Sequence, residues 1–466
     1  MPTKRNPKQA PLKDLDRSAL LAAYRTMVSA RAVDDEEIKL KRKNQIYFQI
    51  SGAGHEAVLT AAGMVLRPAY DYFLPYYRDR ALCMQLGMTP YEMFLQGVGA
   101  EDDPNSGGRQ MPAHWGHAAL NIVSKSSCTG MQTLHAVGVA EAGRYLESFE
   151  EARAGASEFH ADEVVYMSVG DGSISEGEFW EGLNSACNLK LPVLILVEDN
   201  GYAISTPNTV QTAGIPIHEL VASHPHLGVW NVDGTDFRAS YEVLKAAAAH
   251  CRERKGPALV RATTVRPYSH SMSDDQRLYR GEKELEEETH LDPLRRMRRD
   301  LIENEGVKAE DLDALEAECR ADAKEASLRA QSAKRHPPEN ALLYLYSEKR
   351  DATGPEFDHP QESAQSKGGN GTGAEKSISM LEAINRTLHD EMAHDARMLV
   401  FGEDVADATK EEVLGECKGK GGVFKATAGL QRAFGPQRVF NSPLAEANIV
   451  GRAVGMATRG LKPVVE

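Results

Sequence analysis

The chain has 466 residues and a formal net charge of -14, with 54 Lys and Arg residues against 68 Asp and Glu residues. This length accommodates two or three domains, each with its own core. The acidic balance argues against nucleic acid and anionic membranes as partners, and no apolar run approaches the length of a membrane helix. No secretory signal opens the chain, and the six cysteines form no CxxC pair, so we expect a cytoplasmic protein with reduced thiols.

The N-terminal region predicts helices followed by a short strand. Asp16 can cap a helix whose apolar residues, from Leu20 to Val28, recur at helical spacing, and a second, alanine-rich helix follows His55. A strand is expected over residues 72–74, with Arg78 shortly after it. Guanidinium groups pair bidentately with phosphate oxygens, so Arg78 is a candidate phosphate ligand, although a lone arginine is more often a solvated surface charge.

Two polar loops come next. Residues 107–114 form a glycine-rich loop with two possible phosphate ligands, Arg109 and His114, and the hydroxyl-rich stretch 124–132 follows soon after. Taken alone, both stretches are better explained by turn formation and helix capping than by ligand binding.

The region from Val164 to Tyr202 predicts one strand-helix-strand unit. A short apolar run ends in the turn Gly170-Asp171-Gly172, and a second apolar run ends at Asn200. Backbone N–H groups at such a turn, with a helix N-terminus, can bind an anionic phosphate, and both polar side chains follow strand ends. Because Mg²⁺ prefers a few protein oxygens together with phosphate oxygens, the pattern predicts a metal-bridged diphosphate site.

The following elements extend the same sheet. A strand over residues 229–232, a helix over 241–250 and a strand over 258–265 continue the alternation, which predicts an α/β fold with a doubly wound parallel sheet. Ligands bind such sheets at the carboxyl ends of the strands. The last strand leads to His270 at that edge, which makes His270 the best histidine candidate for chemistry, although a lone histidine is more often structural.

The remaining chain predicts three further parts. Residues 281–335 are highly charged and indicate paired amphipathic helices, which would complete a first domain over residues 1–350. Residues 351–376 are rich in Gly, Ser, Gln and Pro and predict a flexible linker. Residues 377–466 predict a second, incomplete α/β unit with strands at 398–401, 438–441 and 462–466. Because its sheet stops on the third strand, we expect the chain to be truncated within this unit.

These motifs together resemble a known family. Gly170-Asp171-Gly172, followed about thirty residues later by Asn200, is similar to the thiamine diphosphate motif. GYAISTP at 201–207 and GRQMPAHW at 108–115 resemble the alpha subunit of branched-chain (2-oxoisovalerate type) 2-oxoacid dehydrogenases. GEDV at 402–405, GGVFKAT at 421–427 and VFNSPLAEANIVGRAVGMA at 439–457 resemble the start of the beta subunit. The chain therefore looks like an alpha-beta fusion of the decarboxylating component.

The resemblance implies a set of site residues. The metal ligands for Mg²⁺ would be Asp171, Asn200 and the backbone carbonyl of Tyr202, beside the turn glycines Gly170 and Gly172. The diphosphate contacts of thiamine diphosphate would be Tyr77, Arg78 and His270. Glu446 would contact the aminopyrimidine ring, where a carboxylate can take part in proton transfer, and His270 would assist acyl transfer.

The resemblance also implies a reaction and partners. It implies oxidative decarboxylation of a 2-oxoacid, with a branched-chain acid favoured and pyruvate next, followed by acyl transfer to the lipoyl group of a partner acyltransferase in a multienzyme complex. A homo-oligomer, as a dimer of the fused chain, is expected. Glu198 is a glutamate, as in pyruvate-type members, where branched-chain members commonly carry arginine, so the sequence mixes the two patterns.

Two alternatives belong to other classes of protein. A nicotinamide-dependent Rossmann dehydrogenase is weakly suggested by Gly170, Gly172 and Gly177, but the carboxylate of Asp171 would repel a pyrophosphate unless a cation intervened. A folded but catalytically inactive truncated fusion is the other alternative.

Overall fold

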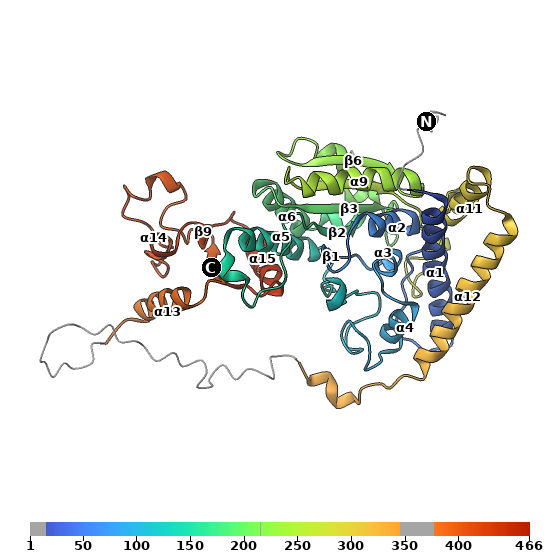
Figure 1. Cartoon of the computed structure of the whole chain (residues 1–466), viewed down its shortest axis with the longest axis horizontal. Coiled ribbons are helices and arrows are strands. Elements are labelled where there is room, and N and C mark those ends of the chain that lie inside the picture. Colours follow the sequence, from blue (N-terminus) through green and yellow to red (C-terminus); the bar gives the residue numbers. More distant parts are fainter. Residues whose placement is uncertain (1–14, 215, 345–376) are drawn as a thin grey trace, which may run out of the picture.

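The computed structural model describes residues 15–214, 216–344 and 377–466 (Figure 1). The predicted linker over residues 351–376 lies outside the described residues. Within the described ranges, none of the helices is both long enough and apolar enough to span a lipid bilayer.

Helices open the chain. The first four are α1 (Arg17–Arg42), α2 (Glu56–Val65), α3 (Arg80–Gln85) and α4 (Pro90–Val98). The side chain of Asp16 accepts a hydrogen bond from the backbone N–H of Ala19 at 2.8 Å, which confirms the predicted N-cap of α1. The predicted apolar stripe of α1 is buried in the core.

A five-stranded parallel sheet forms the centre of the first unit. Its strands are β1 (Tyr72–Leu74), β2 (Val165–Gly170), β3 (Val193–Asp199), β6 (Gly228–Asp233) and β7 (Ala258–Thr263). They lie in the order β1-β2-β3-β7-β6. Gly170 is in register with Glu198, and Glu198 with Ala262, so β2, β3 and β7 end at the same edge of the sheet.

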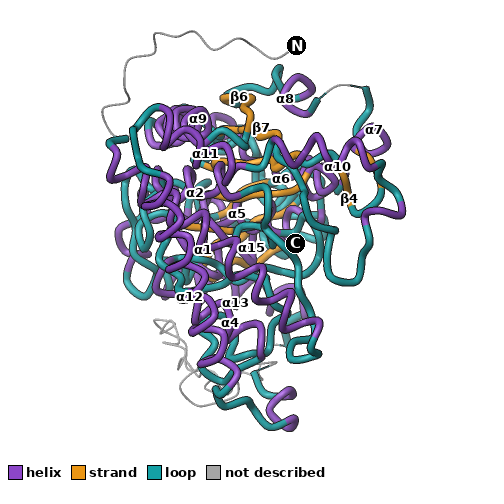
Figure 2. Tube along the Cα trace, turned by 90° about the vertical axis from the view of Figure 1, so that its right-hand side faces the viewer, coloured by secondary structure: helices purple, strands orange, loops and turns teal. Residues whose placement is uncertain are grey.

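Helices cover both faces of this sheet, which confirms the doubly wound α/β prediction. Alternate residues of β2 point to different cores: Met167 packs with residues of α5 (Gln132–Ser148) and α6 (Gly177–Asn188), whereas Tyr166 packs with residues of α2 and α9 (Phe237–Arg252). Both faces of a parallel strand must therefore be apolar, as the continuous run in β2 is. Figure 2 shows the strands in orange, enclosed by these helices.

Smaller elements surround the sheet. Around the site lie η3 (Asp171–Ser175), β4 (Tyr202–Ala203), β5 (Thr206–Pro207), α7 (Asn208–Gln211), α8 (Ile217–Leu220) and η4 (Gln276–Leu278). The charged region forms α10 (Glu282–His290), α11 (Pro293–Glu303) and α12 (Ala309–Gln331), in agreement with the predicted helices. The short 3-10 turns η1 (Ala118–Leu120), η2 (Glu150–Arg153) and η5 (Pro338–Leu342) complete the described part of this unit.

The second unit has its own small sheet. Its elements are α13 (Met380–His394), β8 (Met398–Gly402), η7 (Glu411–Val413), α14 (Leu430–Phe434), β9 (Val439–Asn441), α15 (Glu446–Thr458) and β10 (Lys462–Val465). The strands are parallel in the order β10-β8-β9. This arrangement agrees with the three strands predicted from the sequence.

Helices α5 and α15 join the two units along a seam of glycines (Figure 1). A Cβ atom on Gly138 would lie 2.0 Å from the carbonyl oxygen of Arg452, and one on Gly455 would lie 2.1 Å from that of His135. Only glycine permits such an approach of two helix backbones. Arg452 also pairs with Glu141 on α5 at 2.6 Å.

A second ion pair crosses the end of this seam. The guanidinium of Arg459, which is fully buried, pairs with Glu163 at 2.6 Å and lies 4.1 Å from the ring centroid of Tyr72. The segment 446–459 is thereby attached to the start of the large sheet. Removal of one partner from a buried pair of this kind typically costs about 3 to 5 kcal/mol.

Candidate active site

The carboxyl ends of β2 and β3 bring Asp171 and Asn200 to one edge of the sheet, as predicted. The two glycines of the turn are required by close packing. A Cβ on Gly170 would lie 2.8 Å from the hydroxyl of Tyr76, and one on Gly172 would lie 2.4 Å from the Cβ of Ala203. The helix does not start at this turn: the 3-10 turn η3 comes first and α6 begins at Gly177. The N–H groups next to Asp171 therefore belong to a 3-10 turn.

The carboxylate of Asp171 is buried without a partner. The residue is 4% exposed, and neither oxygen accepts a hydrogen bond among the described residues. Burial, and then the nearby charge of Asp199, raise the pKa of Asp171 to about 7. A buried polar group without a partner is costly, and a bound cation removes that cost.

The residues around Asp171 fit a cation that also takes oxygens from a ligand. Asn200 is 5% exposed, and its side-chain oxygen accepts a hydrogen bond from the backbone N–H of Tyr202 at 3.2 Å. No group of three or more His, Cys, Asp or Glu side chains is placed for a metal in the described ranges. Asp171 and Asn200 supply one carboxylate and one amide oxygen, a donor set that matches the preference of Mg²⁺ for few protein ligands beside phosphate.

His55, which the sequence did not indicate as a site residue, contacts Asn200. Its Nε2 lies 3.4 Å from the side-chain nitrogen of Asn200, and its Nδ1 lies 2.6 Å from a carboxyl oxygen of Glu198. Burial, and then the positive charges of Arg78 and Arg266, hold the pKa of His55 well below its usual range. The ring is therefore neutral and can accept the Asn200 N–H at Nε2 while it donates from Nδ1.

Glu198 continues this buried network. Burial, and then the adjacent Asp79, hold the pKa of Glu198 well above its usual range, so its contact with His55 is a hydrogen bond between neutral groups and not an ion pair. The adjacent Asp79 is buried as well, and burial raises its pKa to about 6. Ser168 donates to the same aspartate at 2.6 Å. Glu198 is thus fully buried and is connected to Asn200 through His55.

Arg78 and His270 meet at the same edge of the sheet. A terminal nitrogen of Arg78 lies 3.2 Å from Nδ1 of His270, and its other terminal nitrogen donates to the backbone carbonyl of Ser51 at 2.5 Å. Nε of Arg78 is buried and has no hydrogen-bond partner among the described residues. The guanidinium is 1% exposed, which excludes the solvated surface charge considered above and leaves a donor available for an anion.

His270 is held as a neutral side chain. Burial, and then Arg78 and Arg266, lower its pKa to about 3. Its backbone N–H donates to Asp274 at 2.9 Å, which fixes the loop, and its ring meets that of Tyr77 edge-on at 6.1 Å. With Nδ1 facing Arg78, the proton of this ring belongs on Nε2.

Tyr77 and His270 line a cavity of about 190 Å³ together with Ser173 of η3. His114 of the glycine-rich loop lines it as well, whereas the guanidinium of Arg109 stacks on Tyr344 at 4.6 Å. Only one of the two possible ligands in this loop therefore reaches the cavity.

Glu446 is not brought to this cavity within the described chain. It is exposed in the first turn of α15 and is absent from the lining of the cavity that holds Tyr77 and His270. The same turn is attached to α6, because the backbone N–H of Asn448 donates to Glu181 at 3.0 Å. From the sequence, Glu446 could join the site either from the same chain or from a second copy, and among the described residues only the half around Asp171 comes together.

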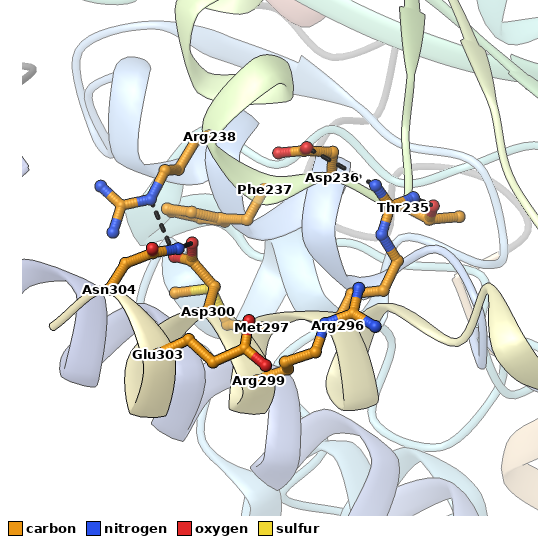
Figure 3. A pocket seen from close by; sticks show the side chains of 10 residues that line it. All are labelled: Thr235, Asp236, Phe237, Arg238, Arg296, Met297, Arg299, Asp300, Glu303 and Asn304. Carbon is orange, nitrogen blue, oxygen red and sulfur yellow. Dashed lines mark hydrogen bonds and ion pairs between the residues drawn. The ribbon is translucent and has the colours of Figure 1, made fainter. Parts of the chain in front are cut away.

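A larger cavity of about 360 Å³ lies between α9 and α11, beside the end of β6, and neither Asp171 nor His270 lines it (Figure 3). Two of its arginines are paired with carboxylates: Arg238 binds Asp300 at 2.8 Å, and Arg296 lies 3.5 Å from Asp236. Since arginine and carboxylate neutralise each other there, this cavity is not the candidate site.

Two known families match this chain, one in each of its two parts. The family described as dehydrogenase E1 component matches residues 24–339, and the transketolase, pyrimidine binding domain matches residues 376–466. The 2-oxoisovalerate dehydrogenase subunit alpha of Bacillus subtilis is 37% identical over 324 residues, which cover 70% of this chain and 94% of that protein.

Further relatives carry related names. The 3-methyl-2-oxobutanoate dehydrogenase subunit alpha of Mycobacterium tuberculosis is 31% identical over 306 residues, or 65% of this chain and 75% of that protein. The pyruvate dehydrogenase E1 component subunit alpha of Staphylococcus aureus is 31% identical over 337 residues, or 72% of this chain and 84% of that protein.

Proposed function

This chain belongs to the dehydrogenase E1 component family, and we propose from that premise that it carries out the oxidative decarboxylation of a 2-oxoacid, with branched-chain acids favoured and pyruvate next. It is an oxidoreductase of the 2-oxoacid dehydrogenase type, in which an alpha-type segment precedes a pyrimidine-binding segment in one chain. Its cofactor is thiamine diphosphate with Mg²⁺ as the partner ion. When bound, this cofactor supplies the electron sink for decarboxylation.

The observation that carries the proposal is the buried Asp171 carboxylate without a hydrogen-bond partner. We assign Asp171, Asn200 and the backbone carbonyl of Tyr202 as the ligands of Mg²⁺. Two neutral oxygens and one carboxylate leave positions for phosphate oxygens, as this ion requires. Gly170 and Gly172 permit the close packing of the turn that presents these ligands.

The diphosphate is assigned to Tyr77, Arg78 and His270. Arg78 is buried and retains an unused N–H, which suits a phosphate oxygen. His270 is neutral, with its proton on Nε2, so it can donate a hydrogen bond to an anion or pass a proton during acyl transfer.

Glu446 completes the site from a second copy of the chain, in a homodimer. The carboxylate of Glu446 is exposed at the start of α15 and does not line the cavity of its own chain. It is therefore available to a second copy. In this arrangement the carboxylate of Glu446 would contact the pyrimidine ring of the cofactor in the neighbouring copy, where it would take part in proton transfer. The division into residues 1–350, 351–376 and 377–466 is retained as the domain proposal.

The acyl product is proposed to pass to the lipoyl group of a partner acyltransferase in a cytoplasmic multienzyme complex. The name of the Staphylococcus aureus relative describes a component of such an assembly. The buried network behind Asn200 keeps the metal ligands fixed, while His270, on a loop beside the cavity, is placed to act on the acyl group.

The test is a calorimetric titration of the purified protein with thiamine diphosphate in the presence and absence of Mg²⁺. We expect Mg²⁺-dependent binding, which Asp171→Ala weakens by about 100-fold or more, because loss of a charged ligand should cost at least as much as loss of a partner that only orients a ligand. Thermal stabilisation by NADH, without any by thiamine diphosphate and Mg²⁺, would favour the Rossmann dehydrogenase and reject the proposal.

A further inference from the structure

Lys125 is a buried lysine in the lining of the cavity that holds His270. The residue is 5% exposed. Its backbone is held from both sides: the N–H donates to the carbonyl of Trp115 at 3.1 Å, and the carbonyl accepts from the side chain of Gln110 at 2.9 Å. The position of Lys125 is therefore set by the fold.

The charge of this ammonium is not neutralised by a contact. Nζ donates to the neighbouring carbonyl of Ser126 at 2.8 Å, and no carboxylate of the described residues lies within 4.0 Å of it. Asp79 attracts it from a longer distance, but that carboxylate already accepts hydrogen bonds from Ser168 and Tyr166. Nζ thus retains donors for a ligand, since an ammonium has three.

Among the described residues that line this cavity, there is no Asp or Glu. The lining combines the apolar side chains of Phe48, Ile50 and Met111 with Lys125 and the hydroxyl-bearing residues Ser127 and Thr129. The remaining ionisable groups of the lining are histidines and tyrosines. An apolar surface that ends at an unpaired cation is complementary to a short carbon chain that ends in an anion.

We propose that Lys125 is a specificity-determining residue that binds a second carboxylate on the acyl group, so that the substrate class includes 2-oxo dicarboxylates. This inference rests on the proposed function, because the cavity must then receive a 2-oxoacid. Two of the relatives are named for branched-chain 2-oxoacids and one for pyruvate, and neither kind of acyl group carries a charge that would use Lys125.

The carboxylate at the far end of the acyl group is a better partner for Lys125 than the carboxylate that is lost as CO₂. Decarboxylation removes the negative charge of the leaving carboxylate, so an ammonium bound to it stabilises the substrate more than the transition state and slows the reaction. A carboxylate at the far end of the acyl group keeps its charge throughout the reaction. An ion pair with Lys125 then contributes to recognition without raising the barrier.

The experiment compares Lys125→Met with a matched variant, Lys324→Met, whose lysine is exposed on α12. Initial rates are measured on the holoenzyme with 2-oxoglutarate and with 3-methyl-2-oxobutanoate, using an artificial electron acceptor. Binding of glutarate, which cannot react, is measured by calorimetry on the same samples, together with the affinity for thiamine diphosphate.

We expect Lys125→Met to lower kcat/KM for 2-oxoglutarate by roughly tenfold or more and to abolish glutarate binding, because the pocket loses a desolvated charge pair. The rate with 3-methyl-2-oxobutanoate should change by less than about threefold, and Lys324→Met should change none of these quantities.

An equal loss with both substrates, unchanged selectivity, or weaker binding of thiamine diphosphate would overturn the proposal, the last because Lys125 would then serve the cofactor. If the unaltered enzyme turns over no 2-oxoacid, the proposed function fails, and the glutarate titration still decides whether Lys125 binds a carboxylate.

Discussion

At the scale of single residues, the orientation of Asn200 depends on His55. The Asn200 amide can present either its oxygen or its nitrogen to a metal, and the neutral His55 ring favours the orientation in which the nitrogen faces Nε2 at 3.4 Å. The side-chain oxygen is then directed away from this contact. His55 is a positioning residue, held in turn by Glu198.

Replacing His55 tests this role. We expect His55→Leu to weaken Mg²⁺-dependent binding of thiamine diphosphate by about 10- to 100-fold, the range found when partners of metal ligands are removed. Calorimetric titration of Mg²⁺ at fixed cofactor concentration measures the effect. His290→Leu, at an exposed histidine, is the control and should bind normally. Unchanged Mg²⁺ affinity in His55→Leu would show that Asn200 is oriented without it.

Lys125 imposes a stability cost that depends on pH. Burial lowers its pKa to about 8, below the unperturbed lysine value of about 10.4, so between these values the unfolded chain binds more protons. The free energy of unfolding therefore rises with pH through this window. The cost of the buried charge is fully present below pH 8.

We predict that Lys125→Met raises the free energy of unfolding by up to about 3 kcal/mol at pH 7, and that this gain disappears above about pH 10.5. Urea denaturation of both proteins from pH 6 to pH 11 measures it. A difference that does not vary with pH would mean that packing of the methionine, and not removal of the charge, is responsible.

At the scale of elements, the glycine seam between α5 and α15 is the most sensitive contact. Gly138 faces a backbone carbonyl at a distance that excludes any Cβ, whereas a Cβ on Gly177, in the first turn of α6, would meet nothing within 4 Å. The same substitution at these two glycines should therefore have opposite effects.

Gly138→Ala should lower the free energy of unfolding by about 1 to 3 kcal/mol, as overpacking does, and speed amide hydrogen exchange in α15. Gly177→Ala should leave it unchanged or raise it by roughly 0.4 to 1 kcal/mol, through the entropy of the unfolded chain. Thermal unfolding and hydrogen exchange measure both effects. If both variants had the same free energy of unfolding and the same exchange rates, α5 and α15 could move apart without loss of stability.

The sequence predicted most elements because their signals are local. Asp16 caps α1, and the apolar runs of β2 and β3 require no knowledge of their neighbours. Helix α5 was not predicted, because its small residues around Gly138 are explained by α15, which lies more than three hundred positions later. The roles of His55 and Lys125 were missed for the same reason, since their partners come together only in the folded sheet.

The sequence predicted the parts of the candidate site that lie at strand ends, but not the contacts between distant segments. The turn around Asp171 and the ends of β3 and β7 follow from the strand pattern, so Asn200 and His270 were expected at one edge, and both lie there. The burial of Arg78 was not predictable, because its partners Ser51 and His270 come from distant segments. Glu446 was assigned through resemblance, and its contribution from a second chain stays a proposal.

At the scale of the whole molecule, the proposed dimer can be tested by mixing two inactive variants. One chain carries Asp171→Ala and the other Glu446→Gln. If each site takes Asp171 from one copy and Glu446 from the other, the mixed dimer has one intact site.

Random reassociation should then restore about a quarter of the original activity, since half of the dimers are mixed and each has one of two sites intact. Each variant alone, reassociated in the same way, is the control and should stay inactive. Absence of recovery, in a sample where native mass spectrometry shows mixed dimers, would place both residues in one chain.

The contact between α5 and α15 also makes the peptide connection between the two units dispensable once they have folded. Glycine packing and the buried pairs of Arg452 and Arg459 hold residues 377–466 against the large sheet. Two separately expressed polypeptides, divided between residues 344 and 377, should therefore co-purify as a stable complex. Gene fusion then guarantees equal amounts of the two parts and correct pairing during synthesis, and adds little to the strength of their association.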